Sequence, residues 1–174
     1  MKVYIIGYMG SGKSSLAPML AGALNLPYID LDTYFEQKYK ITIPLFFEKY
    51  GEVHFRSIEH QLLKEVSLLP DFVLATGGGT PCFHDNMKLM NSTGITIYLM
   101  LSPETLGKRL RKSKTKRPVL KSFDNEKLEE HIREHLHERE YYYRQAQIIL
   151  DNLSPDPSKI TQYILSQQPF RNDT

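Results

Sequence analysis

Residues 7–14 read Gly-Tyr-Met-Gly-Ser-Gly-Lys-Ser and match the pattern G-x-x-x-x-G-K-[ST], in which Gly7 and Gly12 are the defining glycines. Glycines let a backbone pass close to phosphate oxygens, and the N–H groups of the loop and of a following helix supply positive potential. Lys13 adds a point charge, and the hydroxyl of Ser14 is a suitable ligand for Mg²⁺. The motif predicts a phosphate loop (P-loop) that binds a nucleoside triphosphate.

Two carboxylates, Asp30 and Asp32, follow a short apolar run. In an extended segment the period of two places both on one face, at the carboxyl edge of the sheet, where α/β proteins bind ligands. One carboxylate could hold the Mg²⁺ shell through water, and the other could accept a proton from a substrate hydroxyl. The alternative is a solvated turn or a helix N-cap for a segment that starts at Thr33.

Three further features are suited to an anionic substrate. The consecutive glycines at 77–79 follow an apolar run, which suggests that a ligand approaches the backbone closely. Arg56 stands at the head of a predicted helix with Glu59 one turn later, and Arg139 lies in a strongly acidic segment. Each arginine alone could be a surface ion pair, but together they could form a bidentate clamp for a carboxylate.

Short apolar runs of strand length must position these residues, and they are continuous rather than alternating, as in strands buried on both faces of a parallel sheet. The runs are Val3–Ile6, Pro27–Ile29, Phe72–Ala75, Ile95–Leu101 and Ile148–Leu150. Stripes of helical period separate them, from Leu16 to Leu24 and from Ile58 to Leu69. We therefore expect an α/β fold, a three-layer α/β/α sandwich with a five-stranded parallel sheet. Pro18 lies inside the first stripe and should kink that helix or confine it to an irregular first turn.

The composition describes one globular domain over residues 1–174, with 41% apolar and 24% charged residues. The single Cys82 cannot form an internal disulfide, as expected for a reduced cytoplasmic compartment. No apolar run approaches the roughly 20 residues that span a bilayer, and no signal-peptide pattern is present. The net charge of +2 gives no reason to invoke a nucleic acid. We expect a cytoplasmic protein with neither a membrane nor a nucleic-acid partner.

Charge is unevenly distributed along the chain. Residues 108–121 hold eight basic side chains and no acidic one, whereas residues 124–140 hold seven acidic side chains. A local positive segment on a nearly neutral protein suggests that an anionic ligand is met at one place.

Taken in order, these features resemble the shikimate kinase family over nearly the whole chain. The matching segments are the P-loop, Asp30-x-Asp32, Gly51-Glu52-x-x-Phe55-Arg56-x-x-Glu59, Ala75-Thr76-Gly77-Gly78-Gly79, Arg117-Pro118-x-Leu120, and Glu138-Arg139 ahead of Tyr143. A P-loop alone indicates only an NTPase, but related nucleoside monophosphate kinases lack this combination.

The resemblance implies a P-loop kinase that uses ATP and Mg²⁺ to phosphorylate the 3-hydroxyl of shikimate, giving shikimate 3-phosphate and ADP. The implied catalytic residues are Lys13, Asp32 and Arg117. The implied ATP-binding residues are Gly10, Ser11, Gly12, Lys13, Ser14, Ser15, Arg109 and Arg117. Shikimate would be bound by Asp32, Arg56, Gly78, Gly79 and Arg139, with Phe47 and Phe55 as apolar walls. Mg²⁺ would be bound by Ser14 and, through water, by Asp30 and Asp32.

The basic segment, at about 108–122, corresponds to the family's lid, and Arg109 with the loop 151–157 matches the places where the family packs adenine. For that loop an ordinary surface turn is the alternative. We expect a monomer.

Two other functions remain open from the sequence. A different small-molecule kinase, such as a gluconate or nucleoside monophosphate kinase, would share the P-loop. A nucleotide-dependent switch of the GTPase type would also share it, but the chain lacks the Asn-Lys-x-Asp guanine signature and any Asp-x-x-Gly segment.

Overall fold

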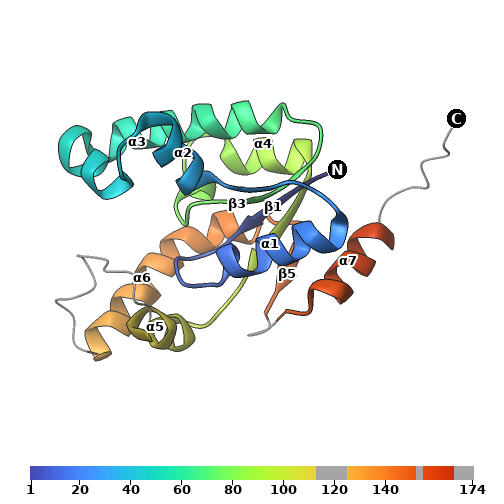
Figure 1. Ribbon diagram of the computed structural model, residues 1–174. Coiled ribbons are helices and arrows are strands. Elements are labelled where there is room, and N and C mark those ends of the chain that lie inside the picture. The colour runs from blue at the N-terminus through green and yellow to red at the C-terminus, as the bar shows by residue number, and fades with distance from the viewer. Residues whose placement is uncertain (113–124, 152–154, 167–174) are drawn as a thin grey trace, which may run out of the picture.

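In the computed structural model, which describes residues 1–112, 125–151 and 155–166, five strands form one parallel sheet (Figure 1). The strands are β1 (Lys2–Ile6), β2 (Tyr28–Asp30), β3 (Phe72–Ala75), β4 (Ile95–Leu99) and β5 (Ile148–Leu150). Their order across the sheet is β2-β3-β1-β4-β5. The five-stranded parallel sheet expected from the apolar runs is therefore confirmed, with β4 ending at Leu99 rather than Leu101.

Helices cover both faces of the sheet, and each face has its own apolar core because successive strand side chains point to opposite sides. Val3 and Ile5 belong to the core shared with α1 (Lys13–Leu24) and α7 (Pro157–Ser166), two helices that lie side by side (Figure 1). Tyr4 and Ile6 belong to the core of the opposite layer. That layer contains α2 (Leu31–Tyr39), α3 (Ile43–Ser67), the 3₁₀ helix η1 (Thr80–Cys82), α4 (Asn86–Thr93), α5 (Pro103–Lys112) and α6 (Asn125–Tyr143). This is the three-layer sandwich that the sequence predicts.

Helix α1 starts directly after the P-loop and continues through Pro18 to Leu24. Pro18 has no N–H to donate to the carbonyl of Ser14, yet both residues are exposed, so solvent can satisfy that carbonyl. The irregular first turn that we expected is therefore not found.

Helix α3 is divided at Gly51, whose φ of 79° and ψ of 168° are not helical. Residues with a side chain rarely adopt this conformation, so a glycine is needed where the two halves meet. The second half carries Phe55, Arg56 and Glu59 on its buried side. The apolar stripe ends earlier than expected, since Leu68 caps the helix and Leu69 beyond it is exposed.

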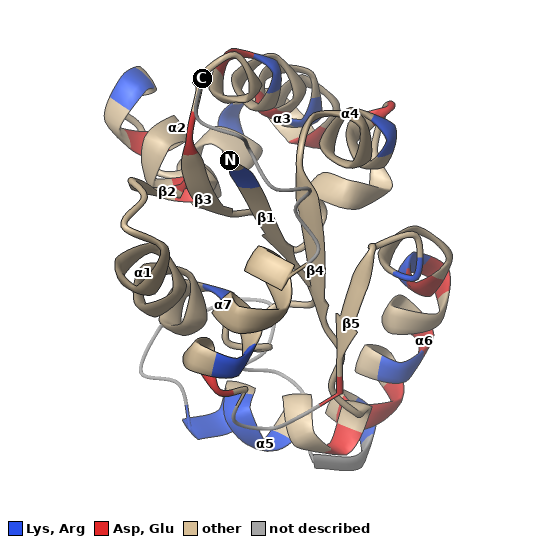
Figure 2. Ribbon diagram, turned by 90° about the vertical axis from the view of Figure 1, so that its right-hand side faces the viewer, with Lys and Arg blue, Asp and Glu red and all other residues tan. Residues whose placement is uncertain are grey.

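Basic side chains gather in the last turn of α5, at Arg109, Arg111 and Lys112 (Figure 2). This turn opens the segment expected to be the lid, of which residues 113–122 lie outside the described residues. Among the helices that the structure describes, none is both long and apolar enough to cross a membrane.

Candidate active site

The P-loop joins the central strand β1 to α1, and its lysine is held by the loop itself. The ammonium of Lys13 is buried and donates hydrogen bonds to the carbonyls of Gly7, at 2.8 Å, and Tyr8, at 3.0 Å. Gly12 caps α1 with a φ of 105°, and the first turn of this helix contains no acidic residue. The positive charge of Lys13 is therefore added to the positive end of the helix dipole.

Arg109 reaches the same loop from α5. Its Nη1 donates to the carbonyl of Ser11 at 2.9 Å. A Cβ atom on Gly12 would lie 3.2 Å from the same Nη1. Ser14 and Ser15 lie exposed on the first turn of α1, and Gly10 packs against Leu110. The described members of the predicted ATP-binding set therefore lie around one loop.

Two predictions, one for the lid and one for the adenine loop, concern residues that the structure does not describe. Arg117 lies outside the described residues, as do residues 152–154 of the predicted adenine loop.

The aspartate pair is arranged differently from the expected extended segment. Strand β2 ends at Asp30, which is the N-cap of α2 and accepts a hydrogen bond from the backbone N–H of Thr33 at 3.0 Å. Asp32 consequently lies in the first helical turn, so the two carboxylates do not share one face of a strand. The N-cap alternative is confirmed for Asp30 because an aspartate oxygen satisfies a helix N–H that would otherwise have no partner.

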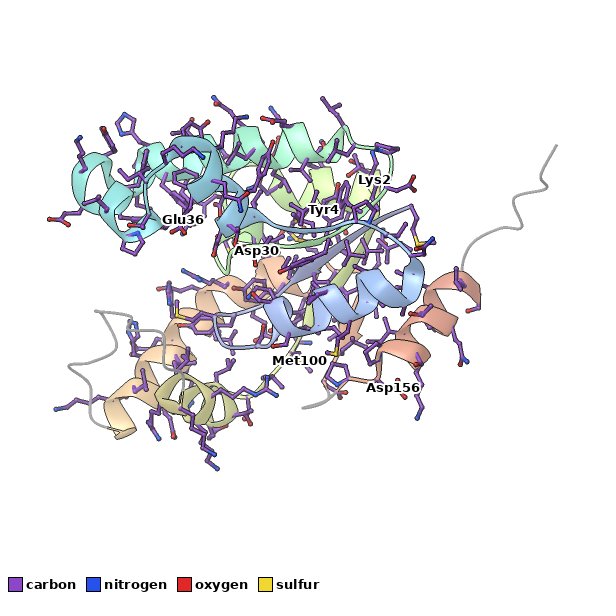
Figure 3. The ribbon with its side chains drawn as sticks, viewed as in Figure 1. Lys2, Tyr4, Asp30, Glu36, Met100 and Asp156 are labelled. Atoms are coloured by element: carbon purple, nitrogen blue, oxygen red, sulfur yellow. The ribbon has the colours of Figure 1, made fainter. Side chains whose placement is uncertain are left out.

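Asp30 nevertheless faces the P-loop helix. The hydroxyl of Ser14 donates to its second carboxylate oxygen at 3.3 Å. Figure 3 shows Asp30 at the end of the sheet opposite Lys2, which begins β1. A hydroxyl and a carboxylate beside a P-loop are the oxygen donors that suit Mg²⁺, which in phosphate sites takes few protein ligands. The donor chemistry of these residues thus fits the expected metal.

The glycine turn after β3 is the surface on which three predicted substrate residues meet. A Cβ atom on Gly77 would lie 2.9 Å from Oδ1 of Asp32, and one on Gly78 would lie 3.8 Å from Nη1 of Arg139. A Cβ atom on Gly79 would collide with the guanidinium of Arg56. At Gly77 and Gly79 a side chain would force these groups to shift, whereas the distance at Gly78 is an ordinary van der Waals contact.

The same turn touches the P-loop, since a Cβ atom on Gly78 would lie 3.3 Å from the backbone N of Met9. The nucleotide loop and the predicted substrate residues are therefore immediate neighbours.

Arg56 is nearly buried and is fixed by two carboxylates. Its Nη1 donates to Glu59 at 2.9 Å, and its Nε and Nη2 donate to Oε1 of Glu52 at 3.1 and 2.9 Å. Burial works to lower the pKa of Arg56, but the two carboxylates, Glu59 above all, raise it beyond its usual value. The guanidinium is thus held charged and in one orientation.

Aromatic rings surround this guanidinium. Its central carbon lies 5.1 Å from the ring centre of Phe55, 5.9 Å from that of Phe47 and 4.4 Å from that of Phe83. Phe47 and Phe55 were expected as apolar walls, and Phe83 was missed. Phe83 follows η1, and only the packing of η1 against α3 brings its ring to Arg56.

Glu59 connects Arg56 to the glycine turn. The carboxylate is 2% exposed, and while Oε2 accepts from Arg56, Oε1 accepts from the hydroxyl of Thr80 at 2.6 Å. Thr80 was also missed by sequence reasoning, although it directly follows the three glycines. A buried carboxylate with both oxygens paired keeps Arg56 in place from the side opposite Glu52.

Arg139 approaches from α6. Its guanidinium lies 5.7 Å from the ring centre of Tyr8, and its Nη2 lies 2.7 Å from Nε2 of His135, one helical turn earlier. The hydroxyl of Tyr143, one turn later, donates to the carbonyl of Gly78 at 2.5 Å. The i, i+4 spacing of these three α6 residues was visible in the sequence, but the partners on other elements were not.

The thiol of Cys82, in η1 beside the glycine turn, is influenced by both arginines. Burial raises the pKa of this thiol to about 11, while the positive charges of Arg139 and Arg56 both oppose this rise.

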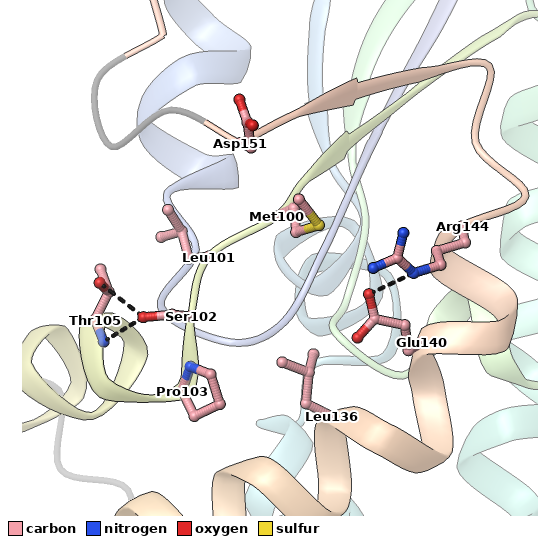
Figure 4. Close-up of a pocket in the computed structure, with 9 residues that line it drawn as sticks. All are labelled: Met100, Leu101, Ser102, Pro103, Thr105, Leu136, Glu140, Arg144 and Asp151. Atoms are coloured by element: carbon pink, nitrogen blue, oxygen red, sulfur yellow. Dashed lines mark hydrogen bonds and ion pairs between the residues drawn. The ribbon is translucent and has the colours of Figure 1, made fainter.

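A cavity of about 410 Å³ lies elsewhere, at the carboxyl end of β4 between the start of α5 and α6 (Figure 4). Its lining residues are Met100, Leu101, Ser102, Pro103, Thr105, Leu136, Glu140, Arg144 and Asp151. Among the described residues, those lining it include none of the predicted catalytic or substrate-binding ones. Asp151, which lines the cavity, is the first residue of the predicted adenine loop.

The chain is similar to known proteins over nearly its whole length. The family model described as shikimate kinase matches residues 9–168. A shikimate kinase of Bacteroides thetaiotaomicron is 41% identical over 151 residues, covering 87% of this chain and 86% of that protein. One of Parabacteroides distasonis is 44% identical over 150 residues, covering 86% and 87%.

Solved structures of shikimate kinases are also similar to this chain. The crystal structure of a shikimate kinase from Bacteroides thetaiotaomicron has a TM-score of 0.88 at 36% identity and covers 95% of this chain and 98% of that one. A shikimate kinase from Acinetobacter baumannii, solved in complex with shikimate, has a TM-score of 0.82 at 34% identity, with coverages of 95% and 90%.

Proposed function

This chain belongs to the shikimate kinase family, and on that premise we propose which of its residues perform each part of the reaction. It is a kinase of the shikimate pathway, which leads to chorismate and the aromatic amino acids. The enzyme transfers the γ-phosphoryl group of ATP to the 3-hydroxyl of shikimate, releasing ADP and shikimate 3-phosphate.

On the nucleotide side, the P-loop N–H groups and Lys13 bind the phosphates of ATP. The proposal is supported by the position of Lys13 at the positive end of α1 and by the contact of Arg109 with the loop. Ser14 and, through water, Asp30 and Asp32 would hold Mg²⁺, which when bound supplies positive charge to the phosphate oxygens. Arg117 is retained from the family resemblance as the lid residue that closes over the phosphoryl group.

On the acceptor side, Arg56 and Arg139 bind the carboxylate of shikimate over the backbone of Gly78 and Gly79. The observation that carries this assignment is the meeting of both arginines and Asp32 at one glycine turn beside the P-loop. Phe47 and Phe55 cover the apolar side of the ring. A guanidinium that is already oriented loses little further freedom on binding, which favours tight recognition.

In the chemical step, Asp32 accepts the proton of the 3-hydroxyl as this oxygen attacks the γ-phosphorus. Such transfers need positioning and charge neutralisation more than covalent chemistry. The adjacency of the glycine turn and the P-loop brings acceptor and donor together, and lid closure would exclude water as a competing acceptor.

A panel of acceptors in a coupled assay of ADP release tests the function. With Mg²⁺ and ATP, we expect shikimate to be strongly preferred over gluconate, CMP and AMP. A preference for one of these three would assign the chain to a different acceptor. ADP release that no acceptor stimulates would favour a nucleotide-dependent switch.

If Arg56 and Arg139 form a clamp for the carboxylate of shikimate, Arg56→Lys should strongly raise the KM for shikimate. An ammonium cannot reproduce the planar fork, so the KM for shikimate should rise on the order of 10- to 100-fold, while the KM for ATP stays nearly constant. Steady-state kinetics with each substrate varied in turn would measure this.

Arg144→Lys is the matched control because Arg144 also pairs with a glutamate, Glu140, at i, i+4 spacing and 2.8 Å, but is exposed. It should leave both KM values unchanged. An unchanged KM for shikimate in Arg56→Lys would contradict the clamp.

A further inference from the structure

His135 lies between the P-loop and Arg139. Its Nε2 is 2.7 Å from Nη2 of Arg139, and its Nδ1 is 3.0 Å from the hydroxyl of Tyr8. A guanidinium has only N–H donors, so Nε2 must be the acceptor and the ring proton must be on Nδ1. The Nδ1–H group then donates to the hydroxyl of Tyr8. The contacts thus specify a neutral ring with one tautomer, bonded to two different elements.

We propose that His135 is a positioning residue that holds Arg139 in place for the carboxylate of the substrate, a role that rests on the function proposed above. An arginine side chain has several rotatable bonds, and fixing one of its N–H groups limits the orientations of the whole plane. With Nη2 bonded to His135, Nη1 is directed toward the glycine turn, where Gly78 lies. Through Tyr8, the same imidazole connects the clamp to the nucleotide loop.

The charges around His135 favour its neutral form. Burial lowers its pKa first, and the charges of Arg139 and His131 on the same helix lower it further. Glu138 on that helix and Glu52 on α3 act in the opposite direction, but the net pKa lies below the usual value. In the part of the chain that the structure describes, Tyr8 of the P-loop is a further titratable neighbour, and its ring meets the imidazole edge-on.

Protonation would reverse the role of the imidazole. The new N–H at Nε2 would face an N–H of Arg139, and two positive charges would become neighbours. Arg139 is therefore held when His135 is neutral and released when His135 is charged. The KM for shikimate should rise as the pH falls below the ordinary histidine value of about 6.5.

Two variants separate the hydrogen bond from the titration. His135→Leu removes both and should raise the KM for shikimate on the order of tenfold, with kcat changed less than about threefold. His135→Gln keeps a carbonyl acceptor within reach of Arg139 but does not titrate. It should recover most of the native KM at about pH 7.5 and show no rise toward about pH 5.5, unlike the native enzyme.

His137→Leu is the matched control, since His137 is exposed on the same helix. Its KM values and their pH dependence should equal those of the native enzyme. An unchanged KM in His135→Leu, or a glutamine variant with the pH dependence of the native enzyme, would overturn the proposal.

A measurement on the native protein tests the geometry without substitutions. Long-range ¹H–¹⁵N correlation should show His135 protonated at Nδ1 and not at Nε2, the reverse of the tautomer that free histidine prefers. Protonation at Nε2 would overturn the proposal even if the leucine variant does not fold. A native enzyme inactive on shikimate would overturn the proposed function and this role together, whereas loss of the His135 effects alone would overturn only this role.

Discussion

A Lys13→Met variant should lose on the order of 10³-fold in kcat, because it removes the point charge proposed to face the transferring phosphoryl group and nothing replaces it. Methionine keeps an unbranched side chain that is one atom shorter, but the carbonyls of Gly7 and Tyr8 lose the donor that they share. The loss should appear in kcat with saturating substrates, and the KM for shikimate should change little.

Lys2→Met provides the control for this experiment. Lys2 also donates to a backbone carbonyl, that of Ser67 at 2.6 Å, but it lies at the opposite end of β1 from the P-loop. Its variant should retain kcat within about twofold, since substitutions away from the reacting atoms rarely change activation free energy. If Lys13→Met retains native turnover while binding ATP, the charge assigned to Lys13 is not needed for transfer.

The second large effect is expected for Asp32→Asn. The amide has the size of the carboxylate and keeps an acceptor oxygen, but it cannot take the proton of the 3-hydroxyl, so kcat should fall on the order of 10²- to 10⁴-fold. Asp32 lies in the first turn of α2, where loss of its charge costs about 0.3–1 kcal/mol of stability. The variant should therefore fold, which thermal unfolding would verify.

Asp85→Asn is the matched control, because Asp85 is an exposed aspartate at the N-cap of α4. It should leave kcat and both KM values at native levels. Near-native turnover in Asp32→Asn would show that another group, or water, accepts the proton.

The sequence was most informative where local pattern and tertiary structure agree. The inner strands were located because strands buried on both faces consist almost wholly of apolar residues, as in Phe72–Ala75. The edge strands β2 and β5 also follow apolar runs, although their residues are only partly buried. The P-loop was found for a related reason, since its glycines and lysine are consecutive and their chemistry is local. The parallel direction of the strands followed from the alternation of strands and helices along the chain.

Predictions were weaker where a residue had two compatible roles. Asp30 ends β2 and also caps α2, where it accepts the N–H of Thr33, so Asp32 lies in a helical turn and not in the extended segment that we expected. Pro18 should interrupt a helix by its own chemistry, but its exposed position made the lost hydrogen bond tolerable.

Contacts between distant segments were beyond local reasoning. Tyr8 and His135 are 127 residues apart in the chain, and neither motif nor period indicates that they meet. Phe83 and Thr80 reach Arg56 and Glu59 only because η1 packs against α3. Such partners meet only in the completed fold, and the local patterns of a single sequence do not indicate which distant residues will be in contact.

Most of the contacts proposed for the acceptor come from one uninterrupted stretch of chain, which begins at Asp32 and ends at Gly79. This stretch follows β2 and contains α2, α3 and β3, whereas Arg109 approaches the P-loop from α5, which follows β4 on the other side of β1. Substitutions within this stretch can therefore change the acceptor contacts while the residues proposed to bind ATP stay the same. Arg139 is the exception because it lies on α6, outside this stretch. A change of acceptor therefore also needs a substitution in a second, distant part of the gene.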